Sequence, residues 1–168
     1  PVGSLDHRLA SVLTPFWDAL GLVRAWRRAP PDCIQVRDKI ASGVVGRAAA
    51  ALLGVPFVYW MSFPVVEGYG ARRDEIGRHG RGLRWLGHAA RAAMSRFALY
   101  RLVLPGARHI FVQSDAMAGW LAGKGFARTR MTAVPMGVDA GLFRRDAVNA
   151  STDPRLDGRR VIVYLGRI

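Results

Sequence analysis

Two stretches near the C-terminal end organise the sequence: residues 131–143, MTAVPMGVDAGLF, and residues 160–168, RVIVYLGRI. The first predicts a short apolar strand that stops at Pro135, because proline fixes its own φ and has no N–H to donate to a strand ladder. Gly137 and Asp139 then predict a turn, since glycine tolerates positive φ and aspartate hydrogen-bonds nearby backbone. We therefore expect a hinge at these three residues.

The second stretch predicts another strand. Residues 161–165 form a continuous apolar run rich in β-branched side chains, which is typical of a strand buried on both faces. The run ends in Gly166 and Arg167. A glycine and a cation at the carboxyl end of a strand suit an anionic ligand.

Length, composition and charge exclude a disordered chain. The 168 residues are 51% hydrophobic and 22% charged, which is ordinary for a globular protein with a sizeable core. The formal net charge is +13, and nearly all of the basic residues are arginine. Arginine favours bidentate contact with phosphate or carboxylate, so we expect anionic partners, although GC-rich coding is an alternative origin of the excess.

Apolar runs alternate with helical patterns along the rest of the chain. Strands are predicted at 32–36, 57–61, 109–113 and 131–134, and helices at 9–28, 41–53 and 115–122. Small residues in 41–53 predict close approach of that helix to a sheet. The alternation predicts an α/β fold with a Rossmann-like parallel sheet and flanking helices. Cys33, at the start of an apolar run, is expected to be a core thiol.

Two further segments matter for function. Residues 62–82 are polar and rich in glycine, and they predict a loop at the carboxyl end of a strand, a common place for ligand contacts. Residues 83–104 predict a long amphipathic helix, stopped by Pro105. Two alternatives stay open for this basic helix: its apolar side packs on the sheet, which is the commoner arrangement, or it lies on an anionic membrane.

Three of these segments carry a resemblance to a known family. VPMGVDAGLF, residues 134–143, resembles the hinge signature of the retaining glycosyltransferases of family 4, and VIVYLGRI, residues 161–168, resembles the first strand of their C-terminal domain. Upstream, ARHIFVQSDAMAGWLAGKGF, residues 107–126, is similar to another segment of that family. The order and spacing of the signatures agree with the family pattern.

The resemblance implies a domain organisation. Residues 1–143 correspond to the N-terminal, acceptor-side Rossmann-like domain of a GT-B fold, 144–159 to an interdomain linker, and 160–168 to the first strand of the nucleotide-sugar-binding domain. The family's first strand with its glycine-rich loop would precede residue 1, and its acidic motif would follow residue 168. We therefore expect a fragment, truncated at both ends and inactive alone.

The resemblance also implies roles for individual residues. Arg167 is the first candidate for a catalytic residue, because a positioned cation neutralises the charge that develops on the leaving diphosphate. Gly166 and Arg167 are the expected donor-binding residues. Ser62 stands where many members of the family have a histidine, and a serine cannot act as a base near neutral pH. Ser62, Glu67 and Ser114 are the candidates for acceptor binding.

The expected partners follow from the same resemblance. They are a nucleotide-sugar donor and an acceptor that is a polysaccharide, a lipid-linked glycan or a small metabolite. No cofactor and no metal are expected, because the histidines and carboxylates show no ligand spacing. No signal peptide is visible, so we expect a cytoplasmic protein, with peripheral contact at the inner face of the membrane as an option for the helix 83–104. The alternative function is a non-catalytic basic α/β module that binds an anionic membrane or nucleic acid; nucleic acid is not the expected partner.

Overall fold

The computed structural model describes residues 5–142, 144 and 153–162. Its contacts divide the chain into two units, Pro1–Pro135 and Met136–Ile168. None of the helices in the described part of the chain combines the length and the apolarity needed to cross a bilayer.

The first unit is built on a four-stranded parallel sheet. Its strands are β1 (Ile34–Arg37), β2 (Phe57–Met61), β3 (His109–Val112) and β4 (Met131–Ala133), and they lie side by side in that order. In register, Ile34 pairs with Phe57, Tyr59 with Ile110, and Ile110 with Met131. The Rossmann-like parallel sheet predicted from the sequence is confirmed.

Helices connect the strands, as parallel pairing requires. They are α1 (Leu5–Arg28), α2 (Ile40–Leu53), α3 (Val65–Arg78), α4 (Leu83–Phe97), a π-helix (Ala98–Val103), α5 (Leu104–Gly106) and α6 (Asp115–Gly123), with a 3₁₀ turn at Arg128–Arg130. The predicted segment 83–104 is thus helical throughout, but it widens into a π-helix after Phe97. Helical structure also runs through Pro105 to Gly106, because a proline is tolerated in the first turn of a new helix.

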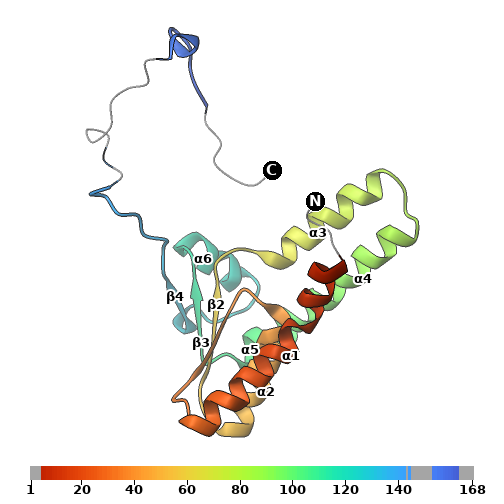
Figure 1. The fold of residues 1–168 in the computed structure, drawn as a ribbon, viewed down its shortest axis with the longest axis vertical. Helices are drawn as coiled ribbons and strands as arrows, with labels where there is room; N and C mark the ends of the chain where they lie inside the picture. Colours follow the sequence, from red (N-terminus) through yellow and green to blue (C-terminus); the bar gives the residue numbers. More distant parts are fainter. Residues whose placement is uncertain (1–4, 143, 145–152, 163–168) are drawn as a thin grey trace. The chain divides into compact units, whose positions relative to one another are not determined.

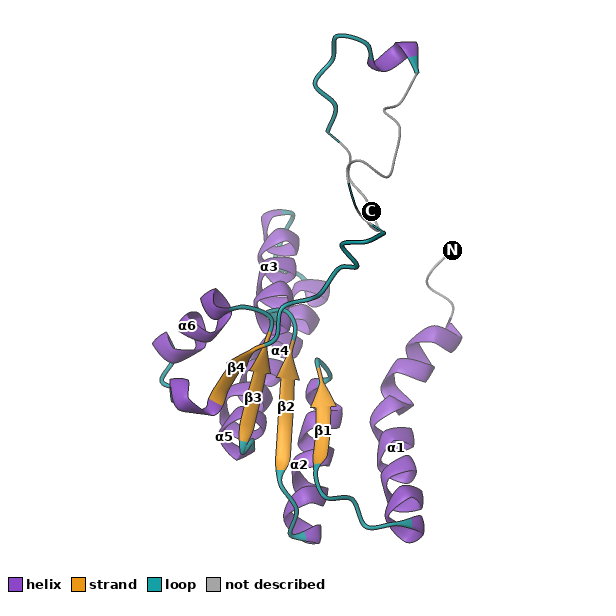
Figure 2. Ribbon diagram, turned by 90° about the vertical axis from the view of Figure 1, so that its left-hand side faces the viewer, coloured by secondary structure: helices purple, strands orange, loops and turns teal. Residues whose placement is uncertain are grey.

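The core lies between one face of the sheet and the helices packed on it, which are α2, the π-helix, α5 and α6. The side chains of Phe57, Tyr59 and Met61 alternate along β2 and are buried on this face. At Gly46 of α2 a Cβ atom would lie 2.9 Å from a methyl of Val36, so only glycine permits this close approach. Figure 2 shows α2 behind the sheet. The predicted packing of a small-residue helix on the sheet is confirmed.

The opposite face of the sheet is only partly covered by the described residues. Trp60 and Phe111 lie side by side on it, with their ring centroids 6.1 Å apart, and both are half-buried. The guanidinium of Arg37 stacks 4.9 Å from the centroid of the Trp60 ring. This is the face turned toward the reader in Figure 2.

The prediction of a loop at residues 62–82 is wrong, because most of this segment forms helix α3. Val65 and Val66 are buried at the start of the helix, and the helix packs along α4. Gly77 allows the indole of Trp85 to lie against it, 3.0 Å from where a Cβ would be. Glycines within the segment lower its intrinsic helix propensity, but tertiary packing on α4 overrides that preference.

The prediction of a buried Cys33 thiol is also wrong. Cys33 is exposed and precedes β1, whose first buried residue is Ile34. The apolar run that suggested burial begins one residue later than the cysteine.

The described part of the second unit is short and contains a turn and a helical turn. Asp139 accepts hydrogen bonds from the backbone N–H groups of Gly141 and Leu142, at 2.8 and 3.2 Å. A 3₁₀ turn follows at Pro154–Leu156, capped by Asp153. Of the strand expected at 161–165, only the first two residues are described, and Gly166 and Arg167 lie outside the described residues.

Candidate functional site

Polar residues follow three of the four strands at the carboxyl edge of the sheet. Asp38 comes directly after β1 and Ser62 directly after β2, and one residue separates Ser114 from the end of β3. Pro135 stands at the same distance beyond β4. Because the strands are parallel, these residues lie along one edge, which is where open α/β sheets bind ligands.

Asp38 and Ser62 join the ends of β1 and β2. The carboxylate of Asp38 accepts a hydrogen bond from the backbone N–H of Ser62 at 2.7 Å, and a second, short one from the Ser62 hydroxyl. Ser62 is buried. Its hydroxyl proton is therefore directed to Asp38, and toward a ligand its oxygen remains as an acceptor.

The backbone of Asp38 adopts a left-handed conformation at the end of β1. Asp38 has φ of 56°, and among the described residues it is the one non-glycine with positive φ. Most residues lose about 1–2 kcal/mol in this conformation, and aspartate tolerates it better because its short side chain hydrogen-bonds locally. The bend directs the chain from β1 into α2 and turns the carboxylate toward Ser62.

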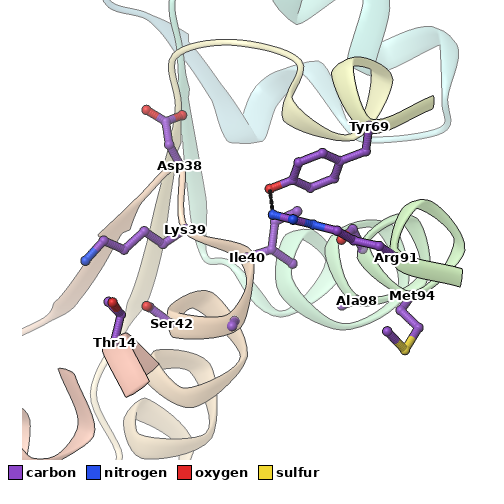
Figure 3. Close-up of a pocket in the computed structure, with 11 residues that line it drawn as sticks. Thr14, Asp38, Lys39, Ile40, Ser42, Tyr69, Arg91, Met94 and Ala98 are labelled. Carbon is purple, nitrogen blue, oxygen red and sulfur yellow. Dashed lines mark hydrogen bonds between the residues drawn. The ribbon is translucent and has the colours of Figure 1, made fainter. Parts of the chain in front are cut away.

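A pocket of about 470 Å³ opens beside Asp38. Figure 3 shows it between the start of α2, Tyr69 of α3 and Arg91 of α4, with Thr14 of α1 at one side. Its lining carries hydroxyl groups, one carboxylate and two cations, from Thr14, Asp38, Lys39, Ser42, Tyr69, Arg91 and Ser95. Hydroxyls with a few charges and an aromatic ring match the polar surface of a hydroxyl-rich ligand.

Contacts within and beside the pocket hold its charged groups in place. Arg91 donates to the Tyr69 hydroxyl at 3.3 Å, and its guanidinium lies 4.6 Å from the centroid of the Tyr69 ring. Across the pocket, Asp18 of α1 accepts from the Ser42 hydroxyl at 2.5 Å and pairs with Lys39 at 3.4 Å. The two cations therefore come from different segments, Lys39 from the residue before α2 and Arg91 from α4, and each is anchored by a neighbour.

Tyr59 lies below this edge of the sheet. Burial raises its pKa above the ordinary value, and the negative charge of Asp38 and the neighbouring Tyr69 raise it further. The Tyr59 hydroxyl therefore stays protonated at any pH at which the fold would operate.

Glu67 lies on α3, away from this pocket. One carboxylate oxygen accepts from the Tyr100 hydroxyl at 2.9 Å and pairs with Lys124 at 3.5 Å. The other oxygen, Oε2, is buried and has no hydrogen-bond partner among the described residues. Burial and then the hydrogen bond with Glu67 raise the pKa of Tyr100. Glu67 thus ties three helical segments together, and its predicted contact with an acceptor stays a prediction.

Ser114 begins helix α6, as the sequence predicted. Its hydroxyl accepts from the backbone N–H of Met117 at 3.2 Å, a normal N-cap. The neighbouring Asp115 pairs with Arg128 at 2.5 Å. Ser114 is exposed at the carboxyl edge, and its role toward an acceptor is likewise a prediction.

The predicted hinge residues fall at the division between the two units. Pro135 is the last residue of the first unit, and Gly137 and Asp139 belong to the second. Asp139 fixes a turn, as expected. Gly137, however, is not among the described glycines with positive φ, so the turn does not use that freedom.

The sequence did not single out Asp38, Lys39, Tyr69 or Arg91. Asp38 carried one usable signal, because it is a carboxylate placed directly after an apolar strand. Tyr69 and Arg91 carried none, since they meet only when α3 and α4 pack together. Across the described residues there is no group of three or more His, Cys, Asp or Glu side chains that could hold a metal.

Comparison with known proteins agrees with the resemblance. A family model described as a glycosyl transferase 4-like domain matches residues 2–137, which include every strand of the sheet and the whole carboxyl edge. Comparison with curated proteins gives no significant match. The family match covers most of the chain. On the evidence of this match and of a parallel α/β sheet with polar residues along its carboxyl edge, the chain belongs to the glycosyl transferase 4-like domain family.

Proposed function

We propose that this chain is the acceptor-side part of a retaining glycosyltransferase, which moves a sugar from a nucleotide-sugar donor to a glycan, a lipid-linked glycan or a small metabolite. The observation that carries this proposal is the family match over residues 2–137. Within the chain, the pocket beside Asp38 is the place we propose for the acceptor, with Ser62 and Ser114 further along the same edge.

In the proposed reaction the protein contributes mainly electrostatic stabilisation. The leaving nucleotide diphosphate gains negative charge as the sugar departs, and cations or helix N-termini stabilise it. We propose Gly166 and Arg167 for this role on the donor side. On the acceptor side, the carboxylate of Asp38 is suited to accept a hydrogen bond from a sugar hydroxyl, and Lys39 and Arg91 are suited to donate.

Nucleotide binding tests the donor half of the proposal. Titration calorimetry of the full-length protein with uridine diphosphate and with guanosine diphosphate should show binding of one of them. Arg167→Ala should weaken it by about 1–3 kcal/mol, the usual range for charge-assisted contacts. Arg155→Ala is the matched control, because that exposed arginine pairs with Asp153 and should leave affinity unchanged.

The outcomes separate the alternatives. Unchanged affinity in Arg167→Ala would remove Arg167 from the site and leave the reaction class standing. Failure to bind either nucleotide, together with no donor consumption in a screen of nucleotide sugars and acceptors, would favour a non-catalytic basic module instead.

A further inference from the structure

Helices α3 and α4 form a hairpin that extends away from the sheet. Figure 1 shows the two helices leaving the body together, with their connection at the far end. The connection, residues 79–82, includes Gly80 with φ of 127°. The hairpin therefore presents the outer side of α4 to the solvent.

The outer side of α4 is its apolar side. The side chains of Leu83, Leu86, Met94 and Phe97 are 86%, 57%, 67% and 61% exposed. Their spacing, in steps of three or four residues and their multiples, places them along one stripe of the helix. The inner side carries the smaller Ala92, which is buried. The commoner arrangement, with the apolar stripe on the sheet, is therefore wrong for this helix.

The segment that carries this apolar stripe has charged residues of one sign. Residues 76–114 contain no aspartate or glutamate, and their arginines are all exposed: Arg78, Arg81, Arg84, Arg91, Arg96, Arg101 and Arg108. Arg78 and Arg84 lie near the end of the hairpin where the stripe begins. An apolar stripe on a segment whose charges are all cationic complements a surface that is apolar inside and anionic outside. The acidic Asp74 and Glu75 of the neighbouring α3 each pair with an arginine.

We propose that the apolar stripe of α4 docks on an anionic lipid bilayer, with the helix in the plane of the interface. The four apolar side chains would enter the boundary of the acyl chains, and the arginines would contact lipid phosphates. Nucleic acid fits less well, because contacts with its phosphates would leave these apolar side chains in water. The docking rests on the surface of α4, and this surface adjoins the pocket beside Asp38, because Met94 of the stripe also lines that pocket.

Vesicle flotation with the full-length protein tests the proposal. We expect binding to vesicles made of equal parts of phosphatidylcholine and phosphatidylglycerol, and at least roughly tenfold weaker binding to phosphatidylcholine alone, because each arginine near an anionic surface is worth about a fivefold change. High salt should weaken the binding, since screening reduces the attraction.

Two variants test the apolar stripe and the neighbouring arginines separately. The stripe variant, Leu86→Gln with Met94→Gln and Phe97→Gln, should bind anionic vesicles at least about tenfold more weakly. Arg78→Gln with Arg84→Gln should lose a similar factor. Leu52→Gln is the control, because Leu52 is 87% exposed on α2 and lies outside the stripe. Unfolding in urea should show that every variant folds.

Three results would overturn the proposal. Equal binding of the wild type and the stripe variant would show that the stripe does not enter the bilayer. Equal binding to both kinds of vesicle would remove the role of anionic lipid. Absence of vesicle binding in a protein that self-associates through the stripe, and becomes monomeric in the stripe variant, would assign the surface to a second copy.

Discussion

At the scale of single residues, the carboxylate of Asp38 holds together the ends of β1 and β2 beside the pocket. It accepts both donors of the buried Ser62 and so fastens the ends of two neighbouring strands. Asp38 is also one of the residues that line the pocket. Asp38 therefore links stability to the proposed binding of an acceptor.

Replacing Asp38 should lower the free energy of unfolding, and alanine should lower it more than asparagine. Asp38→Ala leaves two donors of Ser62 without their acceptor and puts alanine at positive φ, so we expect a loss of about 2–4 kcal/mol in the free energy of unfolding. Asp38→Asn keeps one acceptor oxygen and tolerates the backbone, so we expect about 1 kcal/mol. Urea unfolding measures both.

Asp74→Ala is the control for these variants. Asp74 pairs with Arg73 on the surface, and losing such a pair should change stability by less than about 0.5 kcal/mol. If Asp38→Ala costs no more than this control, the contact between Asp38 and Ser62 does not stabilise the edge.

At the scale of elements, the cluster around Glu67 holds the base of the helical hairpin. Glu67 of α3 contacts Tyr100 of the π-helix and Lys124 at the end of α6. The amino group of Lys124 also lies 4.4 Å from the centroid of the Trp120 ring. A widened helical turn therefore brings Tyr100 to a carboxylate on another helix.

Tyr100 gives this cluster a dependence on pH. Burial and Glu67 raise the pKa of Tyr100, so the folded state holds the phenolic proton more tightly than the unfolded state. The resulting stability is fully present below the ordinary tyrosine pKa of about 10 and is lost as the pH rises above it. We expect Tyr100→Phe to reduce the alkaline loss of stability while costing about 1 kcal/mol at neutral pH, because its hydrogen bond is gone.

The measurement is the free energy of unfolding between about pH 8 and 11, where free tyrosine titrates. Some loss should remain in the variant, because Tyr59 also has a raised pKa. An identical slope in wild type and variant would show that Tyr100 does not couple to folding.

At the scale of the whole molecule, the chain has two units with different amounts of internal structure. The first unit contains the sheet and its core, whereas the described part of the second has one turn and one 3₁₀ turn. Every residue of 154–162 is exposed. Proteolysis follows local exposure and opening of the backbone.

Limited digestion with trypsin should therefore cut the second unit first. Arg159 and Arg160 are exposed and lie outside regular structure, whereas the arginines of the first unit lie mainly in helices and strands. We expect an early fragment that retains the first unit, identified by mass spectrometry. Early cleavage within α3 or α4, with residues 159–160 intact, would contradict this prediction.

The sequence by itself determined the parallel sheet and the small-residue helix that covers it. Apolar runs of strand length alternate with helical patterns, and this local pattern requires crossovers between parallel strands. It also determined the cap at Ser114 and the turn at Asp139, because both depend on contacts within a few residues. The roles of Gly166 and Arg167 stay predictions of the resemblance.

Only the tertiary structure decided how α3 and α4 are placed. The helix at 65–78 forms despite its glycines because it packs on α4, and the apolar stripe of α4 faces outward because its smaller side packs inward. The pocket needs Asp38, Tyr69 and Arg91 from three separate segments. Helical periodicity shows that a stripe exists, but it cannot show which side of the helix a distant segment will cover.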